Sequence, residues 1–196
     1  MRVAGLLLAA GGGTRFGGPK ALAVVEGQLL VERGAAVLTA GGCEPVFVVL
    51  GAGAAEVAAR AAFSGAVELV VAEDWELGLG ASLRAGLTSL PAEVDACAVV
   101  LVDQPLLSSA AVGRVVAAGC QGQVARPAIA TYREVPGHPV LLPRSVWDEV
   151  LATAVGDSGA REWLRIHADR VLRIACDGLG SPRDVDTAGE LEGLKP

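Results

Sequence analysis

The sequence predicts an α/β fold, in which a Rossmann-like, largely parallel sheet carries helices on both faces and a small annex. Two observations lead to this prediction. Short, continuously apolar segments recur along the chain, bounded by Gly, Pro or charged residues, as is typical of strands buried on both faces. Stretches with the apolar spacing of helices separate the first four of these segments, and such alternation is typical of a parallel sheet.

In chain order, strands are expected at the apolar segments 3–10, 46–50, 67–71, 96–102, 140–142 and 171–175. The helices between the first four strands are expected where apolar residues recur every three or four positions, at 29–40, 54–62 and 82–90. Ligands bind such sheets outside the carboxyl ends of the strands. The residues that directly follow each strand are therefore the candidates for function.

Beyond residue 102 the alternation loosens. Helices are expected near 109–118, 145–154 and 159–167, and the Pro- and Gly-rich passage 126–139 is assigned no strand. The second half of the chain is therefore expected to form the annex.

Composition narrows the possible functions. At 196 residues the chain is expected to form one domain, 1–196, because a single core grows to about 250 residues before it splits. A hydrophobic content of 52% excludes an intrinsically disordered chain, and a net charge of -6 leaves no broad basic face for nucleic acid. The apolar runs fall short of the ~20 residues of a membrane span. Neither nucleic acid nor a membrane is expected as a partner.

The cysteines indicate a reducing compartment. They are spaced far apart and form no Cys-x-x-Cys pair, so neither a zinc site nor a redox dithiol is predicted. Four reduced, mostly buried thiols and a cytoplasmic localisation are expected.

The first predicted strand runs into a glycine-rich loop that carries two cations. Its residues are Leu8, Ala9, Ala10, Gly11, Gly12, Gly13, Thr14 and Arg15, with Lys20 a few positions on. Glycines let backbone N–H groups approach an anion closely, while Arg15 and Lys20 supply the positive charge that a polyphosphate requires. The loop therefore predicts a triphosphate cradle.

Two common phosphate motifs do not match this loop. A dinucleotide fingerprint that starts at Gly11 needs glycine where Phe16 stands, and a P-loop needs lysine where Pro19 stands. A glycine-rich turn without function is the structural alternative. Function is favoured because Lys occurs only at positions 20 and 195, whereas Arg occurs fourteen times, so a compact ammonium is retained in this loop.

Carboxylates follow two further segments. Asp103 lies at the mouth of a buried strand, where a charge is costly without a cation or hydrogen bonds, so a magnesium ligand and a turn cap are equally plausible. Asp184 and Asp186 stand two positions apart in a segment predicted to be extended, and only one of them is expected to face a site. We choose Asp186. Its alternative role is purely structural: a carboxylate at the start of the last helix is favoured by the helix dipole.

The remaining candidates lie in loops and at predicted helix starts. Gly80, Ala81 and Ser82 follow the third predicted strand, where they either cap a helix or face a ligand. His138 stands in a rigid Gly-His-Pro loop and is the better candidate for function. His167 lies near the end of a predicted helix and is expected to be structural. The segment from Asp157 to Arg161 carries glycines and an arginine that suit an anion at a helix start. The alternative role of this segment is structural, with Asp157 or Ser158 as a cap between two helices. That role accounts for every residue of the segment except Arg161.

The glycine-rich loop resembles the Leu-Ala-Ala-Gly, Arg, Gly, Lys signature of nucleotidyltransferases with a MobA-like fold. Within that superfamily the sequence is most similar to molybdenum cofactor cytidylyltransferases, over nearly the whole chain. The resemblance implies a nucleotide-diphospho-sugar-transferase-like fold with an acceptor-side annex. It also implies transfer of CMP from CTP to a molybdopterin-type acceptor, with release of pyrophosphate and with Mg²⁺ as cofactor.

The resemblance also assigns roles to residues. Arg15, Lys20 and Asp103 would be catalytic, and Asp103 and Asp186 would hold the metal, with Asp184 as the fallback. The nucleotide would contact the loop from Leu8 to Arg15, Lys20 and Asp103, and its base or ribose would contact Gly80, Ala81 and Ser82. The acceptor side would comprise His138, Asp157 and Arg161. A molybdoenzyme maturation partner is a further expectation.

Three alternatives remain open at this stage. The first is guanylyl transfer to molybdopterin or to a phospholactate, since such enzymes share the first motif. The second is an NAD(P)H-dependent reductase of the nicotine blue type, against which the missing dinucleotide fingerprint argues. The third is a nucleotide sensor in molybdoenzyme maturation that binds a triphosphate without turning it over.

Overall fold

A computed structural model describes residues 1–194. A seven-stranded sheet with the order β5-β4-β1-β6-β8-β7-β9 forms its centre, and β2 and β3 pair as a separate antiparallel ribbon. The strands are β1 (Val3–Ala9), β2 (Val24–Val25), β3 (Gln28–Leu29), β4 (Val46–Leu50), β5 (Val67–Val71), β6 (Ala96–Leu101), β7 (Ala128–Tyr132), β8 (Val135–Pro143) and β9 (Leu172–Ala175). Only β8, among the described strands of the large sheet, runs against the others. The predicted largely parallel α/β sheet is confirmed.

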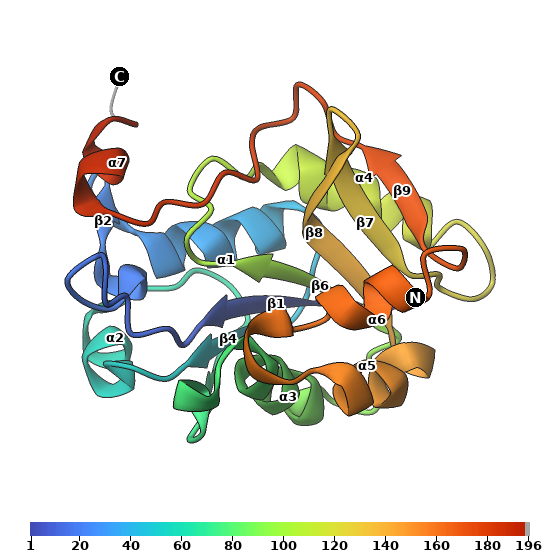
Figure 1. Cartoon of the computed structure of the whole chain (residues 1–196), viewed down its shortest axis with the longest axis horizontal. Helices are drawn as coiled ribbons and strands as arrows, with labels where there is room; N and C mark the ends of the chain where they lie inside the picture. Colours follow the sequence, from blue (N-terminus) through green and yellow to red (C-terminus); the bar gives the residue numbers. More distant parts are fainter. Residues whose placement is uncertain (195–196) are drawn as a thin grey trace.

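Two layers of helices cover the sheet (Figure 1). The helices are α1 (Leu30–Ala40), α2 (Ala54–Arg60), α3 (Leu79–Ser89), α4 (Ser109–Gly119), α5 (Trp147–Thr153), α6 (Arg161–Ile166) and α7 (Ala188–Glu192), with short 3-10 turns at Lys20–Leu22, Trp75–Leu77, Arg144–Val146 and Gly156–Ser158. In Figure 1, α1 and α4 lie on one side of the sheet, and α3, α5 and α6 lie on the other.

The central strand shows how the sequence produces these layers. Every residue of β1 is buried, as expected for a strand with parallel neighbours on both edges and helices on both faces. Successive side chains of a strand point to opposite faces. Leu7 therefore joins the core beneath α1 and α4, whereas Leu6 and Leu8 join the core beneath α3, α5 and α6.

The passage 126–139 corrects the sequence-based expectation. It contains β7 and the first half of β8, a strand much longer than the predicted segment 140–142. Proline lacks a backbone donor and normally interrupts a sheet. Here the prolines are tolerated because Pro136 lies beyond the part of β8 that pairs with β6, and Pro139 lies at a register irregularity against β7.

The segment from Asp177 to Thr187, called the return segment below, carries the chain from the annex back along the carboxyl edge of the sheet (Figure 1, red). The amide of Val185 donates to the carbonyl oxygen of Asp103 at 2.9 Å. Val185 also packs with Leu191 of α7 against Val25 and Leu30. The return segment is thereby held beside the ends of β1 and β6, and it brings Asp184 and Asp186 to that edge.

None of the helices within residues 1–194 has the length and apolar character required to cross a lipid bilayer.

Candidate active site

A cavity of about 580 Å³ opens at the carboxyl ends of β1 and β6. The glycine-rich loop forms one wall, and the segment that leads into α3 forms another. The return segment contributes Asp186. The lining comprises Leu8, Ala10, Gly11, Gly12, Gly13, Thr14, Arg15, Phe16, Lys20, Trp75, Glu76, Gly78, Leu79, Ser82, Leu101, Val102, Asp103, Asp157 and Asp186. We call it the first cavity.

The glycine-rich loop is closed by a tight turn around Gly13. The amides of Phe16, Gly17 and Gly18 all donate to the carbonyl oxygen of Gly13, at 2.9, 2.9 and 3.2 Å. Gly13 has a φ of 58°, and a Cβ at this position would collide with the carbonyl of Gly18. Only glycine closes this turn without strain, and the turn carries Arg15 and Lys20 to the cavity.

Four charged side chains meet at this cavity, and we call them the charge cluster. The Nζ of Lys20 donates to Oδ2 of Asp103 at 3.0 Å and to Oδ1 of Asp186 at 2.9 Å. Arg15 Nη1 pairs with the other oxygen of Asp186 at 3.1 Å. The cluster therefore joins the loop after β1, the turn after β6 and the return segment.

Burial and charge set the pKa values of this cluster. Burial raises the pKa of Asp103 above its ordinary value, because the charge of Lys20 offsets only part of the desolvation. The hydrogen bond from Lys20 lowers the pKa of Asp186. Burial alone would lower the pKa of Lys20, but the bonds and charges of Asp186 and Asp103 outweigh it and raise that pKa. The ammonium is therefore held charged between the two aspartates.

The two aspartates suit a magnesium ion that also binds phosphate. Oδ1 of Asp103 is buried and has no hydrogen-bond partner within residues 1–194, so one oxygen remains for a cation. No group of three or more His, Cys, Asp or Glu side chains able to hold a metal occurs in the described part of the chain. Magnesium is commonly bound by one or two carboxylates together with substrate phosphates and water, which matches this donor set.

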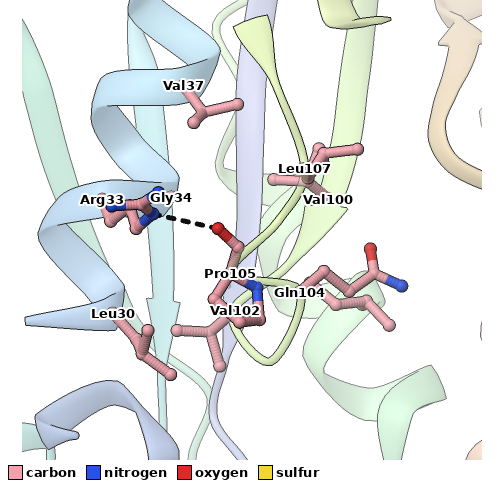
Figure 2. Close-up of a pocket in the computed structure, with 10 residues that line it drawn as sticks. Leu30, Arg33, Gly34, Val37, Val100, Val102, Gln104, Pro105 and Leu107 are labelled. Atoms are coloured by element: carbon pink, nitrogen blue, oxygen red, sulfur yellow. Dashed lines mark hydrogen bonds between the residues drawn. The ribbon is translucent and has the colours of Figure 1, made fainter. Parts of the chain in front are cut away.

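The turn after β6 is anchored from two sides. Figure 2 shows Arg33 of α1, whose Nε donates to the carbonyl oxygen of Pro105 at 2.9 Å. A cavity of about 10 Å³, the space of one water, lies beside this bond. On the other side, Nε2 of Gln104 donates to the Pro182 carbonyl at 3.0 Å and to Asp184 Oδ1 at 2.8 Å. These bonds fix the turn that presents Asp103.

A second cavity of about 640 Å³ adjoins the first and shares Leu8, Leu79 and Leu101 with it. Its lining is mostly apolar and comes from α3, β6, β8, α6 and the return segment. His138, Arg161 and Asp184 are among its polar side chains. Asp184 and Asp186 thus line different cavities. Residues two apart in a regular strand point to the same side, so this separation arises because the return segment is not a regular strand here.

The structure places some predicted residues away from the positions that their roles suggest. Ala9 is 2% exposed and points into the core on the α1 side, and neither Gly80 nor Ala81 lines the first cavity. Helix α3 begins at Leu79, earlier than the predicted residue 82, so Gly80 lies in its first turn against the carbonyl of Ala154. Asp157 lines the first cavity rather than the second.

Trp75 is a cavity residue that the sequence analysis did not consider. Its indole lies against Gly12 and Gly51, where a Cβ would come within 3.2 Å and 2.5 Å of the ring carbons. Because neither glycine has a Cβ, there is room for the indole at this position. Two signals were available: aromatic residues make up only 4% of the chain, and Trp75 closely follows a predicted strand.

His138 is a neutral imidazole at ordinary pH. Burial lowers the pKa of His138 to about 4; the negative charge of Asp184 opposes this effect and Arg161 adds to it. In the unfolded chain the pKa is near 6.5. Stability that is present above about pH 6.5 is therefore lost as the pH falls towards 4, because only the unfolded state takes up the proton in that range.

We expect His138→Asn to remove part of this acid sensitivity. The free energy of unfolding, measured with urea, should decrease between pH 7.5 and pH 4.5 in both proteins. The decrease should be smaller in the variant than in the wild type, by on the order of 2 kcal/mol. Equal falls in the two proteins would contradict the assigned state of His138.

Comparison with known proteins identifies the family. The family model described as the MobA-like NTP transferase domain matches residues 5–171. The chain belongs to the MobA-like NTP transferase family. The matched range includes the glycine-rich loop, Asp103, His138 and Arg161, whereas Asp186 lies beyond it.

Two relatives show how far this likeness extends. The MobA-like chain is 38% identical over 194 residues to the nicotine blue oxidoreductase of Paenarthrobacter nicotinovorans, covering 96% of this chain and 94% of the relative. Rv0371c of Mycobacterium tuberculosis H37Rv is 30% identical with a TM-score of 0.82, covering 99% and 97% of the two chains. A structure of Rv0371c in complex with manganese is 28% identical with a TM-score of 0.78, covering 99% of this chain and 98% of the other.

A nucleotidyl transferase from Methanothermobacter is 19% identical, with a TM-score of 0.77 and coverage of 99% and 96%. At this identity the likeness concerns the fold. The MobA-like chain thus has the fold of nucleotidyl transferases and belongs to a family that acts on nucleoside triphosphates.

Proposed function

We propose that this chain transfers CMP from CTP to the terminal phosphate of a molybdopterin-type acceptor and releases pyrophosphate. The observation that carries the proposal is the charge cluster, which gathers Arg15, Lys20 and Asp103 beside the glycine-rich loop. The two cavities meet near this cluster and offer adjacent space for a triphosphate and for an acceptor. Such an arrangement supports a reaction between two bound phosphates.

In this proposal the acceptor phosphate attacks the α-phosphorus of CTP in line with the leaving group. A new P–O bond forms at the α-phosphorus, the bond to the β-phosphate oxygen breaks, and its electron pair leaves with pyrophosphate. Reactions of this kind are catalysed mainly by positioning and charge neutralisation. Arg15 and Lys20 supply cations for the triphosphate and for pyrophosphate as it leaves.

Asp103 and Asp186 would hold Mg²⁺, which supplies further neutralisation of the phosphate charge when bound. The manganese complex of Rv0371c supports a divalent cation in a related protein. The buried, unpartnered oxygen of Asp103 supports the same role in this chain.

The second cavity suits an acceptor with an apolar, ring-containing body. Leu83, Ile129 and Val140 line its walls, while Arg161 and the neutral His138 supply hydrogen-bond donors and acceptors. Most ligand pockets combine such an apolar lining with a few polar groups that orient the ligand. The pterin part of a molybdopterin-type acceptor is a flat ring system whose faces can pack against such walls and whose edges carry hydrogen-bond donors and acceptors.

Thermal stability with CTP, GTP, ATP, UTP and NADPH, each with and without Mg²⁺, tests this proposal. A ligand at about 100 times its dissociation constant adds roughly 2.7 kcal/mol, which for a chain of this size corresponds to a melting shift of several degrees. We expect a shift selective for CTP with Mg²⁺. A GTP-selective shift would instead indicate guanylyl transfer to molybdopterin or to a phospholactate.

The name of one relative favours a second candidate. Because a nicotine blue oxidoreductase is 38% identical over 194 residues, an NAD(P)H-dependent reductase acting on a flat aromatic heterocycle is the alternative proposal. Its substrate would occupy the same apolar second cavity. A stability shift with NADPH alone, together with loss of NADPH absorbance on adding such a substrate, would replace the transferase proposal.

A further inference from the structure

Lys20 occupies the space between the two aspartates proposed to hold the metal. Its ammonium lies 3.0 Å from one oxygen of Asp103 and 2.9 Å from one oxygen of Asp186. The Lys20 side chain is 15% exposed, so the ammonium lies within the site rather than in bulk solvent. It therefore stands in for a cation at this position.

The charges of the cluster balance one another. Asp103 and Asp186 carry two negative charges, and Lys20 and Arg15 carry two positive charges within hydrogen-bond distance of them. Arg15 is 78% exposed and contacts only Oδ2 of Asp186, whereas Lys20 contacts both carboxylates. Lys20 is thus the cation that a divalent ion has to displace.

We propose that Lys20 is an exchangeable counter-ion: it competes with a divalent cation for Asp103 and Asp186 in the nucleotide-free protein and turns to the triphosphate when the cation arrives with the nucleotide. This inference rests on the proposed function, because the triphosphate is the partner that receives the ammonium. The glycine-rich loop and Arg15 line the same cavity as Lys20, so the anion that receives the ammonium lies within reach of its flexible stem.

Electrostatics explain why the two cations exclude each other. An ammonium and a divalent ion that both contact the carboxylates of Asp103 and Asp186 would lie only a few ångströms apart, where their repulsion in a partly buried site is strong. A bound triphosphate removes this conflict because it adds negative charge for both. Metal and nucleotide are therefore expected to strengthen each other's binding, and Lys20 is the side chain that couples them.

Mn²⁺ binding in the absence of any nucleotide tests the inference directly. We compare the wild type with Lys20→Met, which keeps an unbranched side chain one atom shorter and removes the charge, and with Lys20→Arg, which keeps the charge. Free Mn²⁺ is measured by electron paramagnetic resonance. Lys20→Met should bind Mn²⁺ on the order of 10- to 100-fold more tightly than the wild type, in the range of typical coupling between sites. Lys20→Arg should bind it as weakly as the wild type.

A double variant locates the ion. Asp103→Asn in the Lys20→Met background should abolish the gain, because the carboxylate that the ammonium leaves behind is then neutral. Lys20→Gln, which is neutral and keeps a donor for Asp103, gives the same comparison should Lys20→Met fold poorly.

Either of two results would overturn the inference: Mn²⁺ binding to Lys20→Met that is no tighter than to the wild type, or a gain that survives Asp103→Asn. Since no nucleotide is present, these results do not depend on which triphosphate the protein uses. Failure of CTP to bind would instead count against the proposed function alone.

Discussion

Replacing Lys20 by Ala is expected to lower the turnover number for CTP by about two orders of magnitude or more. The ammonium is the least exposed cation of the charge cluster and faces the cavity in which the glycine-rich loop would hold the triphosphate. Loss of a preorganised contact to charge that develops in the transition state typically costs 10²- to 10³-fold in rate. Steady-state kinetics with CTP, Mg²⁺ and a molybdopterin-type acceptor measure the effect.

A matched control separates this effect from a general loss of positive charge. Arg60→Ala removes an exposed cation on α2 whose salt bridge to Glu56 lies on the surface, and its turnover should equal that of the wild type. The circular dichroism spectrum of Lys20→Ala should be unchanged, because Lys20 starts a single short 3-10 turn and its side chain belongs to neither main core. Wild-type turnover in Lys20→Ala would refute the catalytic role.

The same position should respond in opposite directions in two assays. Removing the ammonium is expected to slow transfer while it tightens metal binding in the nucleotide-free protein. A side chain that only stabilised the loop would weaken both. The pair of measurements therefore distinguishes an exchangeable counter-ion from a structural lysine.

Asp103→Asn is expected to abolish the dependence of nucleotide binding on magnesium. The carboxylate lies two residues beyond β6, and its buried Oδ1, which has no hydrogen-bond partner among the described residues, is available to a divalent ion. An amide has almost the same shape but no charge for a divalent ion. Titration calorimetry with CTP, with and without Mg²⁺, should show equal affinities in the variant and a clear difference in the wild type.

Asp184→Asn is the matched control for this experiment. Asp184 lines the second cavity and accepts a hydrogen bond from Gln104, so nucleotide binding should keep its magnesium dependence in this variant. Retained magnesium dependence in Asp103→Asn would place the metal elsewhere. Loss of that dependence in Asp184→Asn would exchange the proposed roles of Asp184 and Asp186.

The first half of the fold was predictable because the local sequence pattern of each segment and its place in the sheet favour the same structure there. Segments 46–50 and 67–71 match β4 and β5. The first is continuously apolar and fully buried, as expected of a strand between two neighbours, whereas the second contains Glu68 and forms the partly exposed edge of the sheet. The annex was harder because its strands contain Pro136 and Pro139. Their tolerance depends on which stretches of β8 pair with β6 and β7, and local sequence does not contain that information.

The candidate site was predictable as a set of residues but not as an arrangement. Arg15, Lys20, Asp103 and Asp186 all line one cavity, as the rule about carboxyl ends of strands suggests. The direct bonds from Lys20 to both aspartates could not be predicted, because they depend on the path of the return segment. The position of Gly80 likewise depends on α3 beginning one turn early against Ala154.

The return segment has a consequence for the order in which the site comes into being. Lys20 and Asp186 are separated by 166 positions, so a growing polypeptide displays the glycine-rich loop and Asp103 long before Asp186 emerges from the ribosome. Until Val185 reaches the Asp103 carbonyl and α7 settles against Leu30, the ammonium has one carboxylate instead of two. Partly synthesised chains therefore lack the complete cluster.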